Sequence, residues 1–254
     1  MTNWPSQFLN AEDHNRILAP PRMAGSFSIP QAHELQNEIL NLRTARGETV
    51  IGFKVEPASE DPTGIVCGTL TERMVVQAES RVDLPAHAAT QIQPALAFRF
   101  KSAIDAKSAN NMQLLSAIEF VMAAMEFSVS RYGHASVTDA DRIADNGSAF
   151  RFALGTRGLT PSALDLMHVG CLIEIDGELA TSAAGCRAFG SPLEAVVRLA
   201  AALRSTGRSI EAGHVVLVCG VADPVPVTGG QACAVTFAHL GSVWVRTSTI
   251  SSSI

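Results

Sequence analysis

The sequence predicts an α+β fold with a mixed, largely antiparallel β-sheet core and a helical N-terminal portion. Apolar residues at helical spacing are confined to a few segments, while β-branched and aromatic runs fill much of the remainder. The later runs are joined by short turns, and Asp176-Gly177 is typical of a two-residue hairpin. We therefore expect an N-terminal arm and helix over 1–47 and one main domain over 48–254.

Composition and charge exclude several classes of function. The 254 residues are 47% hydrophobic and 17% charged, which is enough apolar material for a substantial core. Nineteen basic residues against 24 acidic ones lack the basic excess of a nucleic-acid binder. No apolar run approaches the roughly 18 to 20 residues of a membrane span, and the N-terminus does not resemble a secretory signal. We expect a cytoplasmic protein that binds neither nucleic acid nor membrane.

Several common catalytic motifs are absent from the sequence. It contains no G-x-S-x-G elbow, P-loop, G-x-G-x-x-G fingerprint or H-E-x-x-H, and its five scattered cysteines form no C-x-x-C pair. These absences disfavour the common nucleotide enzymes, the serine hydrolases and a structural zinc site.

The N-terminal portion is predicted from prolines and a capping motif. Three prolines interrupt residues 1–27, which are expected to form an irregular surface arm. A helix then begins after Ser28, which can form a capping box with Gln31. Apolar residues follow at helical spacing, and Gly47 ends the helix.

The middle of the chain is predicted to contain two strands and one helix. Runs of β-branched and aromatic residues over 49–55 and 90–100 predict the strands. The stretch 56–77 is rich in Pro, Gly, Asp and Thr and predicts a loop or flap. Residues 110–129 carry Leu, Ile and Met at spacings of three and four, which predicts a helix whose methionines pack in the core.

The remainder is predicted to be mostly strands around one helix. A polar, acidic loop ends in Asn146-Gly147, which is a turn signal. The helix begins after Ser191, with Pro192 at its first position and Glu194 completing a capping box. The closing strands are expected over 214–221 and 234–248.

Six segments occur in the order in which one known family has them: LRTARGETVIGFKV, SAIEFVMAAMEFSVSRY, DADRIADNGSAF, FGSPLEAVVRLAAAL, EAGHVVLVCGVADPVPVTGG and HLGSVWV. On these segments the chain resembles the 2-keto-4-pentenoate hydratase and 4-oxalocrotonate decarboxylase family of the fumarylacetoacetate hydrolase superfamily. The resemblance runs from about Ser28 to near the C-terminus. It implies a rolled β-sheet core, a catalytic domain over 48–254 and assembly into homo-oligomers.

The resemblance also implies a lyase that hydrates or decarboxylates a short 2-oxo or 2-hydroxydienoate acid. In the family, Mg²⁺ or Mn²⁺ chelates the acid, and a hard cation can polarise the keto group. Two of its acidic ligands come from an E-x-E on a strand, and the third from the end of the middle helix. Gln93 and Ala95 stand where the two glutamates are expected, and only Glu126 matches a ligand position. We therefore expect no cofactor, or weakly bound Mg²⁺ or Mn²⁺.

Two residues are predicted to be catalytic on the same resemblance. Lys54 matches the family's active-site lysine, and without a cation it could attract the substrate carboxylate or stabilise an enolate. An ordinary strand-end lysine with its ammonium in water is the alternative. Ser148 matches a serine that contacts the substrate or the proton-transfer water.

The predicted substrate-binding residues are Gln93, Leu96, Asp145, Asn146 and Arg99. Asp145 and Asn146 match the family signature, although a polar turn is an equally good interpretation of them. Arg99 shares a strand face with Gln93 and could pair with Glu126 or clasp a carboxylate. A solvated strand end is the more common state of such an arginine.

Other departures from the family pattern predict a less polar pocket. The family's D-F-G becomes Val66-Cys67-Gly68, which removes an acidic proton carrier, and its T-G-S becomes Val218-Cys219-Gly220. The working hypothesis is a lyase with a degraded metal site, favoured by Lys54 and Ser148. The lost carboxylates favour two alternatives: a metal-independent isomerase, cyclase or decarboxylase acting on a less polar acid, or a non-catalytic homologue serving as a subunit beside an active paralogue.

Overall fold

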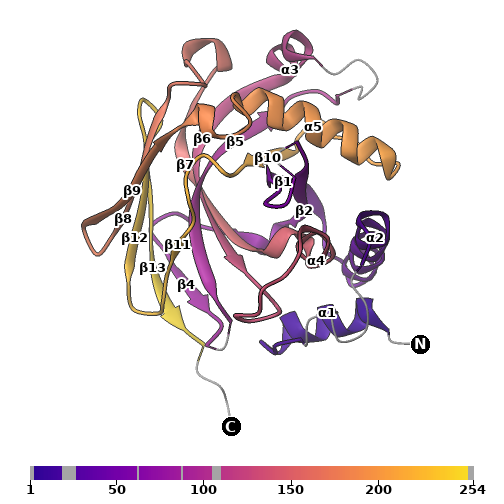
Figure 1. Cartoon of the computed structure of the whole chain (residues 1–254). Coiled ribbons are helices and arrows are strands. Elements are labelled where there is room, and N and C mark those ends of the chain that lie inside the picture. Colours follow the sequence, from indigo (N-terminus) through magenta and orange to yellow (C-terminus); the bar gives the residue numbers. More distant parts are fainter. Residues whose placement is uncertain (1–2, 19–26, 62, 87, 105–109, 251–254) are drawn as a thin grey trace.

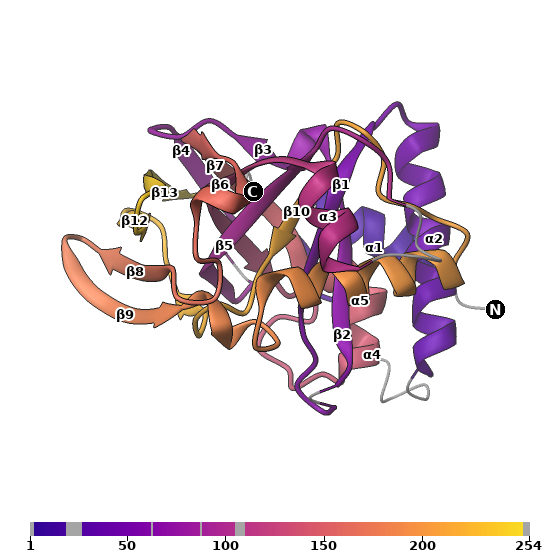
Figure 2. The same cartoon turned by 90° about the horizontal axis from the view of Figure 1, so that it is seen from above.

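The protein's computed structural model describes residues 3–18, 27–61, 63–86, 88–104 and 110–250. These residues form an eight-stranded and a five-stranded β-sheet, with helices gathered on one side (Figures 1 and 2). The helices are α1 (Trp4–Asp13), α2 (Ile29–Ala45), α3 (Asn111–Ala117), α4 (Asp139–Ala144) and α5 (Pro192–Ser205).

The larger sheet curls around the interior of the molecule. Its strands follow the order β2 (Ile65–Thr71), β1 (Val50–Pro57), β10 (Val215–Val218), β5 (Thr90–Phe100), β6 (Ile118–Val129), β7 (Ala149–Leu159) and β3 (Val75–Val76), with β11 (Val225–Pro226) beside β5. The smaller sheet has the order β4 (Arg81–Leu84), β13 (Gly241–Thr249), β12 (Ala232–Phe237), β8 (Gly170–Ile175) and β9 (Glu178–Ala184). Among the described strands only β1–β10, β3–β7 and β4–β13 pair in parallel, so the predicted mixed, largely antiparallel sheet is confirmed.

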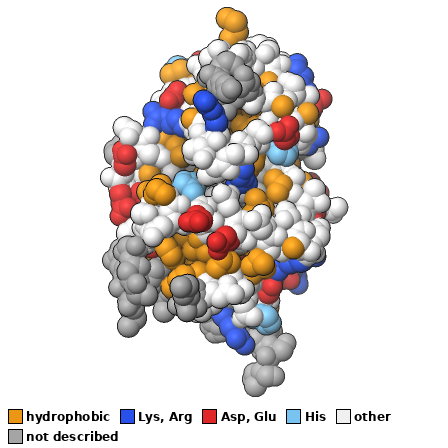
Figure 3. Space-filling model, turned by 90° about the vertical axis from the view of Figure 1, so that its right-hand side faces the viewer, with side chains coloured by type: hydrophobic (Ala, Val, Ile, Leu, Met, Phe, Trp, Pro, Cys, Tyr) orange, Lys and Arg blue, Asp and Glu red, His pale blue; other side chains and the backbone are white. Residues whose placement is uncertain are grey.

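The core lies on both faces of the central strands. Along β5, Leu96 and Phe98 join the main apolar cluster, which extends to the smaller sheet and α5, whereas Ala95 and Ala97 join a second cluster. A strand covered on both faces needs a nearly continuous apolar sequence, which explains the run PALAF. A third cluster joins α1, α2 and α4, and Figure 3 shows that the face over these helices carries scattered charges of both signs around apolar side chains.

Elements with strong local signals lie where the sequence places them. Ser28 and Gln31 form the predicted capping box at the start of α2, and β5 has the predicted bounds. Asp176 and Gly177 have φ of 53° and 85°, as a type I′ hairpin between β8 and β9 requires. Ser191 caps α5 by accepting from Leu193 N, but Glu194 forms no capping box and pairs with Arg198 instead.

Besides the capping box of Glu194, five predictions are wrong. Residues 139–144, predicted as part of an acidic loop, form α4, because Thr138 and Asp141 form a capping box at its start. The predicted strand over 234–248 is divided into β12 and β13 by a turn at 238–240.

Residues 4–13 form α1 rather than an irregular arm, because Pro5 lies in the first turn, where a proline costs no hydrogen bond, and Asn3 caps the helix. The stretch 56–77 contains β2, not only a loop. Residues 118–129 form β6 instead of continuing the helix over 111–117, because pairing with both β5 and β7 outweighs the helical spacing. The other two prolines of the arm, at 20 and 21, lie outside the described residues.

The methionines of residues 110–129 lie in three different environments. Met125 packs in the main core and Met122 against the second cluster, on opposite faces of β6, while Met112 on α3 is 81% exposed. Core packing is therefore confirmed for Met122 and Met125 only. Among the described helices, none has the length and apolar character that crossing a bilayer requires.

Candidate active site

Lys54 is fully buried on β1, which lies between β2 and β10 in the larger sheet. Its Nζ donates to Glu126 Oε1 at 2.8 Å and to the Gly147 carbonyl at 2.9 Å, and lies 3.8 Å from Glu56 Oε1. The alternative of a strand-end lysine in water is wrong, because the side chain is enclosed by these acceptors.

Strand register brings the carboxylates to this lysine. Lys54 and Glu56 lie two residues apart on β1 and share a face, while Gln93 on β5 is the direct partner of Glu126 on β6. Gln93 Nε2 donates to Glu56 Oε2 and to Glu126 Oε2, both at 2.9 Å. Three strands therefore build a buried cluster in which one ammonium and one amide supply the donors to two carboxylates.

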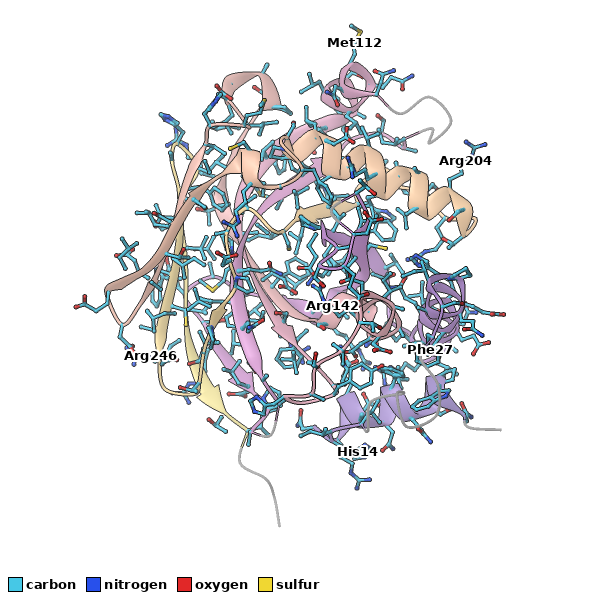
Figure 4. The ribbon with its side chains drawn as sticks, viewed as in Figure 1. His14, Phe27, Met112, Arg142, Arg204 and Arg246 are labelled. Atoms are coloured by element: carbon cyan, nitrogen blue, oxygen red, sulfur yellow. The ribbon has the colours of Figure 1, made fainter. Side chains whose placement is uncertain are left out.

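Arg142 closes the cluster from α4. Its guanidinium pairs with Glu56 and, at 3.1 Å, with Asp139, and its side chain lies against the interior of the molecule (Figure 4). Asp139 also accepts from Ser59 N and Oγ and from Glu60 N. These bonds tie α4 to the segment that follows β1 and thereby fix Glu56.

The turn after α4 aims a carbonyl at Lys54. Asn146 clamps β2 with two bonds, accepting from Thr69 N at 2.7 Å and donating to Thr69 O at 2.9 Å. Residues 146–148 all have φ between 54° and 63°, a left-handed run that the clamp must hold in place. The strand approaches so closely that a Cβ at Gly68 would lie 2.2 Å from Asn146 O. Asn146 therefore positions the Gly147 carbonyl. Its side-chain oxygen and nitrogen are both used in hydrogen bonds to the Thr69 backbone, so they are not free to bind a ligand.

Asp145 lies behind this turn. It accepts from Arg131 N and from Arg131 Nη1, both at 3.0 Å, and is almost fully buried. Burial raises the pKa of Asp145 to about 6, although Arg131 opposes the shift. The structure thus places Asp145 in a buried ion pair rather than on the wall of a cavity.

A cavity of about 320 Å³ adjoins the cluster. Glu56, Gln93, Arg142 and Ser148 line it on the side of the cluster, and Lys54 and Glu126 lie directly behind Gln93 and Glu56. The remaining wall is mostly small or polar and includes Gln91, Ser128, Ser130, His134 and Pro224. Ser148, Gln93, Lys54 and Glu126 are thus the predicted site residues that the fold brings together.

Two predicted residues of β5 lie elsewhere. Leu96 is fully buried in the main core, on the strand face opposite to Gln93. Arg99 shares the face of Gln93 but lies six residues further along the strand, about 20 Å away at the usual rise. Pairing of Arg99 with Glu126 is therefore wrong, because Glu126 bonds to Lys54 and Gln93, and Arg99 is a half-exposed residue near the strand end.

Burial and the charges of the cluster shift the pKa values of its two glutamates in opposite directions. Burial alone would raise the pKa of Glu56, but the charges of Lys54 and Arg142 outweigh it, so this pKa lies below its usual value. Burial raises the pKa of Glu126, and Lys54 offsets this only in part. Burial would lower the pKa of Lys54, but Glu126 and Glu56 keep it above its usual range. Lys54 is cationic and Glu56 anionic, and Glu126 is the group that protonates more readily.

Sequence reasoning missed Glu56, Arg142 and His134. A signal existed for Glu56, because it follows Lys54 by two residues and shares its face once the predicted strand over 49–55 is extended by one residue, as β1 is in the structure. Arg142 lies inside the segment DADRIADNGSAF, but no local pattern shows that it reaches back to β1. His134 lines the cavity from an irregular segment and carries no spacing signal.

The donor set does not fit a divalent metal at the family's ligand positions. At these positions Gln93 presents its amide nitrogen to two carboxylates, Ala95 offers no ligand atom, and Glu126 is already paired with Lys54. Mg²⁺ requires about six oxygen ligands in near-octahedral geometry. Within the described part of the chain, no group of three or more His, Cys, Asp or Glu residues is arranged to hold a metal ion.

Comparisons with known proteins agree with this fold. No family model matches the sequence. The chain is 30% identical over 224 residues to a 4-oxalocrotonate decarboxylase of Pseudomonas sp. (strain CF600), covering 85% of this chain and 84% of the relative. It is 29% identical over 246 residues to a 2-hydroxyhexa-2,4-dienoate hydratase of Comamonas testosteroni, covering 91% of each. The solved structure of 4-oxalocrotonate decarboxylase from Pseudomonas putida G7, complexed with magnesium and adipate, superposes with a TM-score of 0.91 at 26% identity and covers 96% of this chain and 95% of that one.

Fold and relatives together define an enzyme of the lyase class on the rolled sheet of the fumarylacetoacetate hydrolase type, which confirms the predicted fold class. The chain belongs to the 2-keto-4-pentenoate hydratase and 4-oxalocrotonate decarboxylase family. Magnesium or calcium is present in two of the similar solved structures, so divalent metal binding occurs among its relatives.

Proposed function

We propose that this protein is a hydratase or decarboxylase of a short 2-oxo or 2-hydroxydienoate acid, and that it binds its divalent cation weakly or not at all. The substrate class is supported by the names of the relatives, which act on such acids. The observation that carries the metal proposal is the pair of bonds from Gln93 Nε2 to Glu56 and Glu126. A nitrogen donor stands where the family has a carboxylate ligand, and Lys54 neutralises the one ligand that remains.

Arg142 is the proposed anchor of the substrate carboxylate. Among the described residues that line the 320 Å³ cavity, it is the one arginine or lysine. Its pairs with Glu56 and Asp139 fix the plane of the guanidinium, and a fixed guanidinium binds a carboxylate with well-defined geometry. A substrate held there has its reacting carbons next to Glu56, Gln93 and Ser148.

Glu56 is the proposed proton acceptor. Hydration and decarboxylation of these acids both interconvert a 2-hydroxy enol and a 2-oxo form. In that step the enol O–H bond breaks and its proton goes to a base, the C–O bond becomes a carbonyl, and the electron pair of the C=C bond takes a proton from that base at a carbon of the substrate. Glu56 lines the cavity and its pKa is lowered, so in this proposal it accepts the hydroxyl proton, and Ser148, which lines the same cavity, hydrogen-bonds the same oxygen. Lys54 holds Glu56 in its charged form and is a positioning residue in this scheme.

A metal-independent isomerase is the second candidate. Moving a proton from oxygen to carbon needs only one base and one anchored carboxylate, and the cluster contains both without a metal ligand set. A lyase also adds water or loses CO₂, so the products separate the two candidates.

The test is turnover of 2-hydroxypenta-2,4-dienoate and 4-oxalocrotonate by the purified protein before and after EDTA treatment. We expect loss of the diene absorbance with a hydrated or decarboxylated product, and little change after chelation. Arg142→Gln is expected to raise KM far more than Lys101→Met, the control substitution of an exposed lysine. An unchanged KM in Arg142→Gln would refute the carboxylate anchor.

Metal binding is tested separately by titrating Mg²⁺ into the wild-type protein, Gln93→Glu and the double variant Gln93→Glu with Ala95→Glu. The wild type is expected to bind in the millimolar range or not at all, and the double variant is expected to bind more tightly. Stoichiometric Mg²⁺ retained by the wild type through gel filtration would overturn the proposal, whatever the reaction proves to be.

A further inference from the structure

A second cavity, of about 450 Å³, lies apart from the candidate active site. The ends of α1 and α2, the segment around β3, strand β4 and the start of β7 together enclose it, and it shares no lining residue with the first cavity. Five arginines line it: Arg43, Arg46, Arg73, Arg81 and Arg151. Guanidinium groups this close together repel one another unless anionic groups lie between them.

The carboxylates of this cavity already have partners. Glu12 pairs with Arg43 and with Arg131 behind the wall, and Asp13 pairs with Arg46 at 2.7 Å. Glu48 is buried and pairs with both Arg43 and Arg46. The remaining one, Asp83, accepts from the hydroxyl of Ser248. Glu12, Asp13 and Glu48 therefore neutralise Arg43 and Arg46, and Asp83 is the one lining carboxylate that has no arginine partner among the described residues.

Three arginines on the opposite wall have no carboxylate partner in the described structure. The side chains of Arg73 and Arg81 make no hydrogen bond or ion pair with the described residues, and the side chain of Arg151 donates only to the Phe150 carbonyl and stacks on the Phe150 ring. Arg43, which is 4% exposed, also keeps a buried Nε without a hydrogen-bond partner. Arg151 is half-buried, whereas Arg73 and Arg81 are exposed at the mouth of the cavity. A half-buried cation without a counter-charge is costly, because burial removes hydration that no ion pair replaces.

The surroundings of Arg151 also disfavour its positive charge. Burial lowers the pKa of this guanidinium, and the nearby charges of Arg131 and Arg43 add to the shift, while Glu12 offsets it only in part. An anion next to Arg151 would relieve both effects. Guanidinium groups bind carboxylate and phosphate through paired N–H···O bonds, so oxyanions fit them best.

We infer that this cavity binds a small dianion that carries carboxylate or phosphate groups, held by Arg73, Arg81 and Arg151. Its wall includes α1, α2 and strands of both sheets, so a bound ligand would tie the N-terminal helix to the rest of the fold. The site is separate from the proposed reaction, and neither requires the other.

Thermal unfolding and isothermal titration with inorganic phosphate and with succinate test this inference on the full chain, with NaCl at matched ionic strength as the reference. At least one of the two dianions is expected to bind saturably and raise Tm beyond NaCl. Binding of phosphate alone would identify a phosphate compound, and binding of succinate alone a dicarboxylate. Equal effects of all three salts would overturn the inference.

Variants locate the binding. Arg151→Gln is expected to weaken the affinity about tenfold, and the triple variant with Arg73→Gln and Arg81→Gln to abolish it. Arg204→Gln, an exposed arginine at the far end of α5, is the matched control and should leave binding unchanged (Figure 4). If the triple variant does not fold, Arg151→Gln alone decides, and wild-type affinity in it would refute the site.

Discussion

Replacing Lys54 by Met tests whether the buried cluster is held together by its ammonium group. The substitution keeps an unbranched chain of similar volume but removes the donor to Glu126 and to the Gly147 carbonyl. Glu126 is 1% exposed, so water does not reach it in place of the lysine. Glu56 retains Arg142 and Gln93, whereas Glu126 retains Gln93 alone.

The expected cost follows from this loss of a single partner. Removing one member of a buried ion pair destabilises a protein by about 3–5 kcal/mol, because the other charge stays buried without compensation. For a chain of this size, about 1 kcal/mol corresponds to roughly 2–4 °C in Tm, so Lys54→Met is expected to lower Tm by about 6–20 °C. Burial already raises the pKa of Glu126. At acidic pH, protonation of Glu126 would remove its buried charge, and the loss of stability in Lys54→Met would be about 3 kcal/mol, the lower end of the range of about 3–5 kcal/mol.

A double-mutant cycle separates the pair from the rest of the site. Glu126→Gln removes the charge and keeps the shape, and in combination with Lys54→Met it should restore about 2–3 kcal/mol of the loss. Urea unfolding followed by circular dichroism measures all four proteins, and Lys101→Met controls for loss of a lysine in general. If the two single losses simply add, within about 0.5 kcal/mol, Lys54 and Glu126 are not coupled and the reasoning is refuted.

Three further predictions concern the support of the site. Asn146→Ala should cost about 2–4 kcal/mol, because it leaves the buried N–H and C=O of Thr69 unpaired, and thermal unfolding should detect it; wild-type stability would show that the clamp is unimportant. Gly68→Ala should yield little folded protein by circular dichroism and gel filtration, because its Cβ would overlap Asn146 O; a well-folded variant would contradict the close approach. The pKa of Glu48 is lowered below 4.5, since Thr71, Arg43 and Arg46 outweigh its burial. Its stabilisation is therefore complete above about pH 4.5 and disappears as the pH falls through the lower folded value, so urea midpoints in Glu48→Gln should vary less with pH below 4.5 than in the wild type.

Local signals in the sequence were sufficient for elements that depend on few neighbours. The capping box at Ser28, the positive-φ turn at Asp176-Gly177 and the apolar run of β5 are properties of short segments, and the structure has all three. Residues 118–129 are different, because their conformation is decided by β5 and β7 on either side. Helical spacing of Leu, Ile and Met cannot reveal those partners. Leu115, one of the apolar residues that defined the predicted helix over 110–129, is in fact 42% exposed.

In the site, too, local patterns predicted some features, whereas others depend on contacts between distant segments. Alternation along β5 correctly placed Gln93 and Arg99 on one face, but a shared face does not mean proximity, and Arg99 lies opposite Phe120, about 20 Å along the strand from the Gln93–Glu126 pair. Lys54, Ser148 and Glu126 came from the family resemblance, and the fold does bring them to one place. Glu56 was missed because the resemblance offered no role for it, although its spacing from Lys54 already placed both on one face.

The resemblance places metal ligands at positions 93, 95 and 126, and the contacts of Gln93 show how the charges balance when only Glu126 is an acid. A glutamate at position 93 would add a third carboxylate to Glu56 and Glu126 around one lysine, which a divalent cation could balance. With glutamine there, the two carboxylates face two cations, Lys54 and Arg142, and the amide supplies one donor to each carboxylate. Glutamine at position 93 and the Glu56–Arg142 pair therefore balance the charge of the cluster together. On this argument Gln93→Glu alone should destabilise the metal-free protein, and added Mg²⁺ should restore more stability to the double variant with Ala95→Glu than to the wild type.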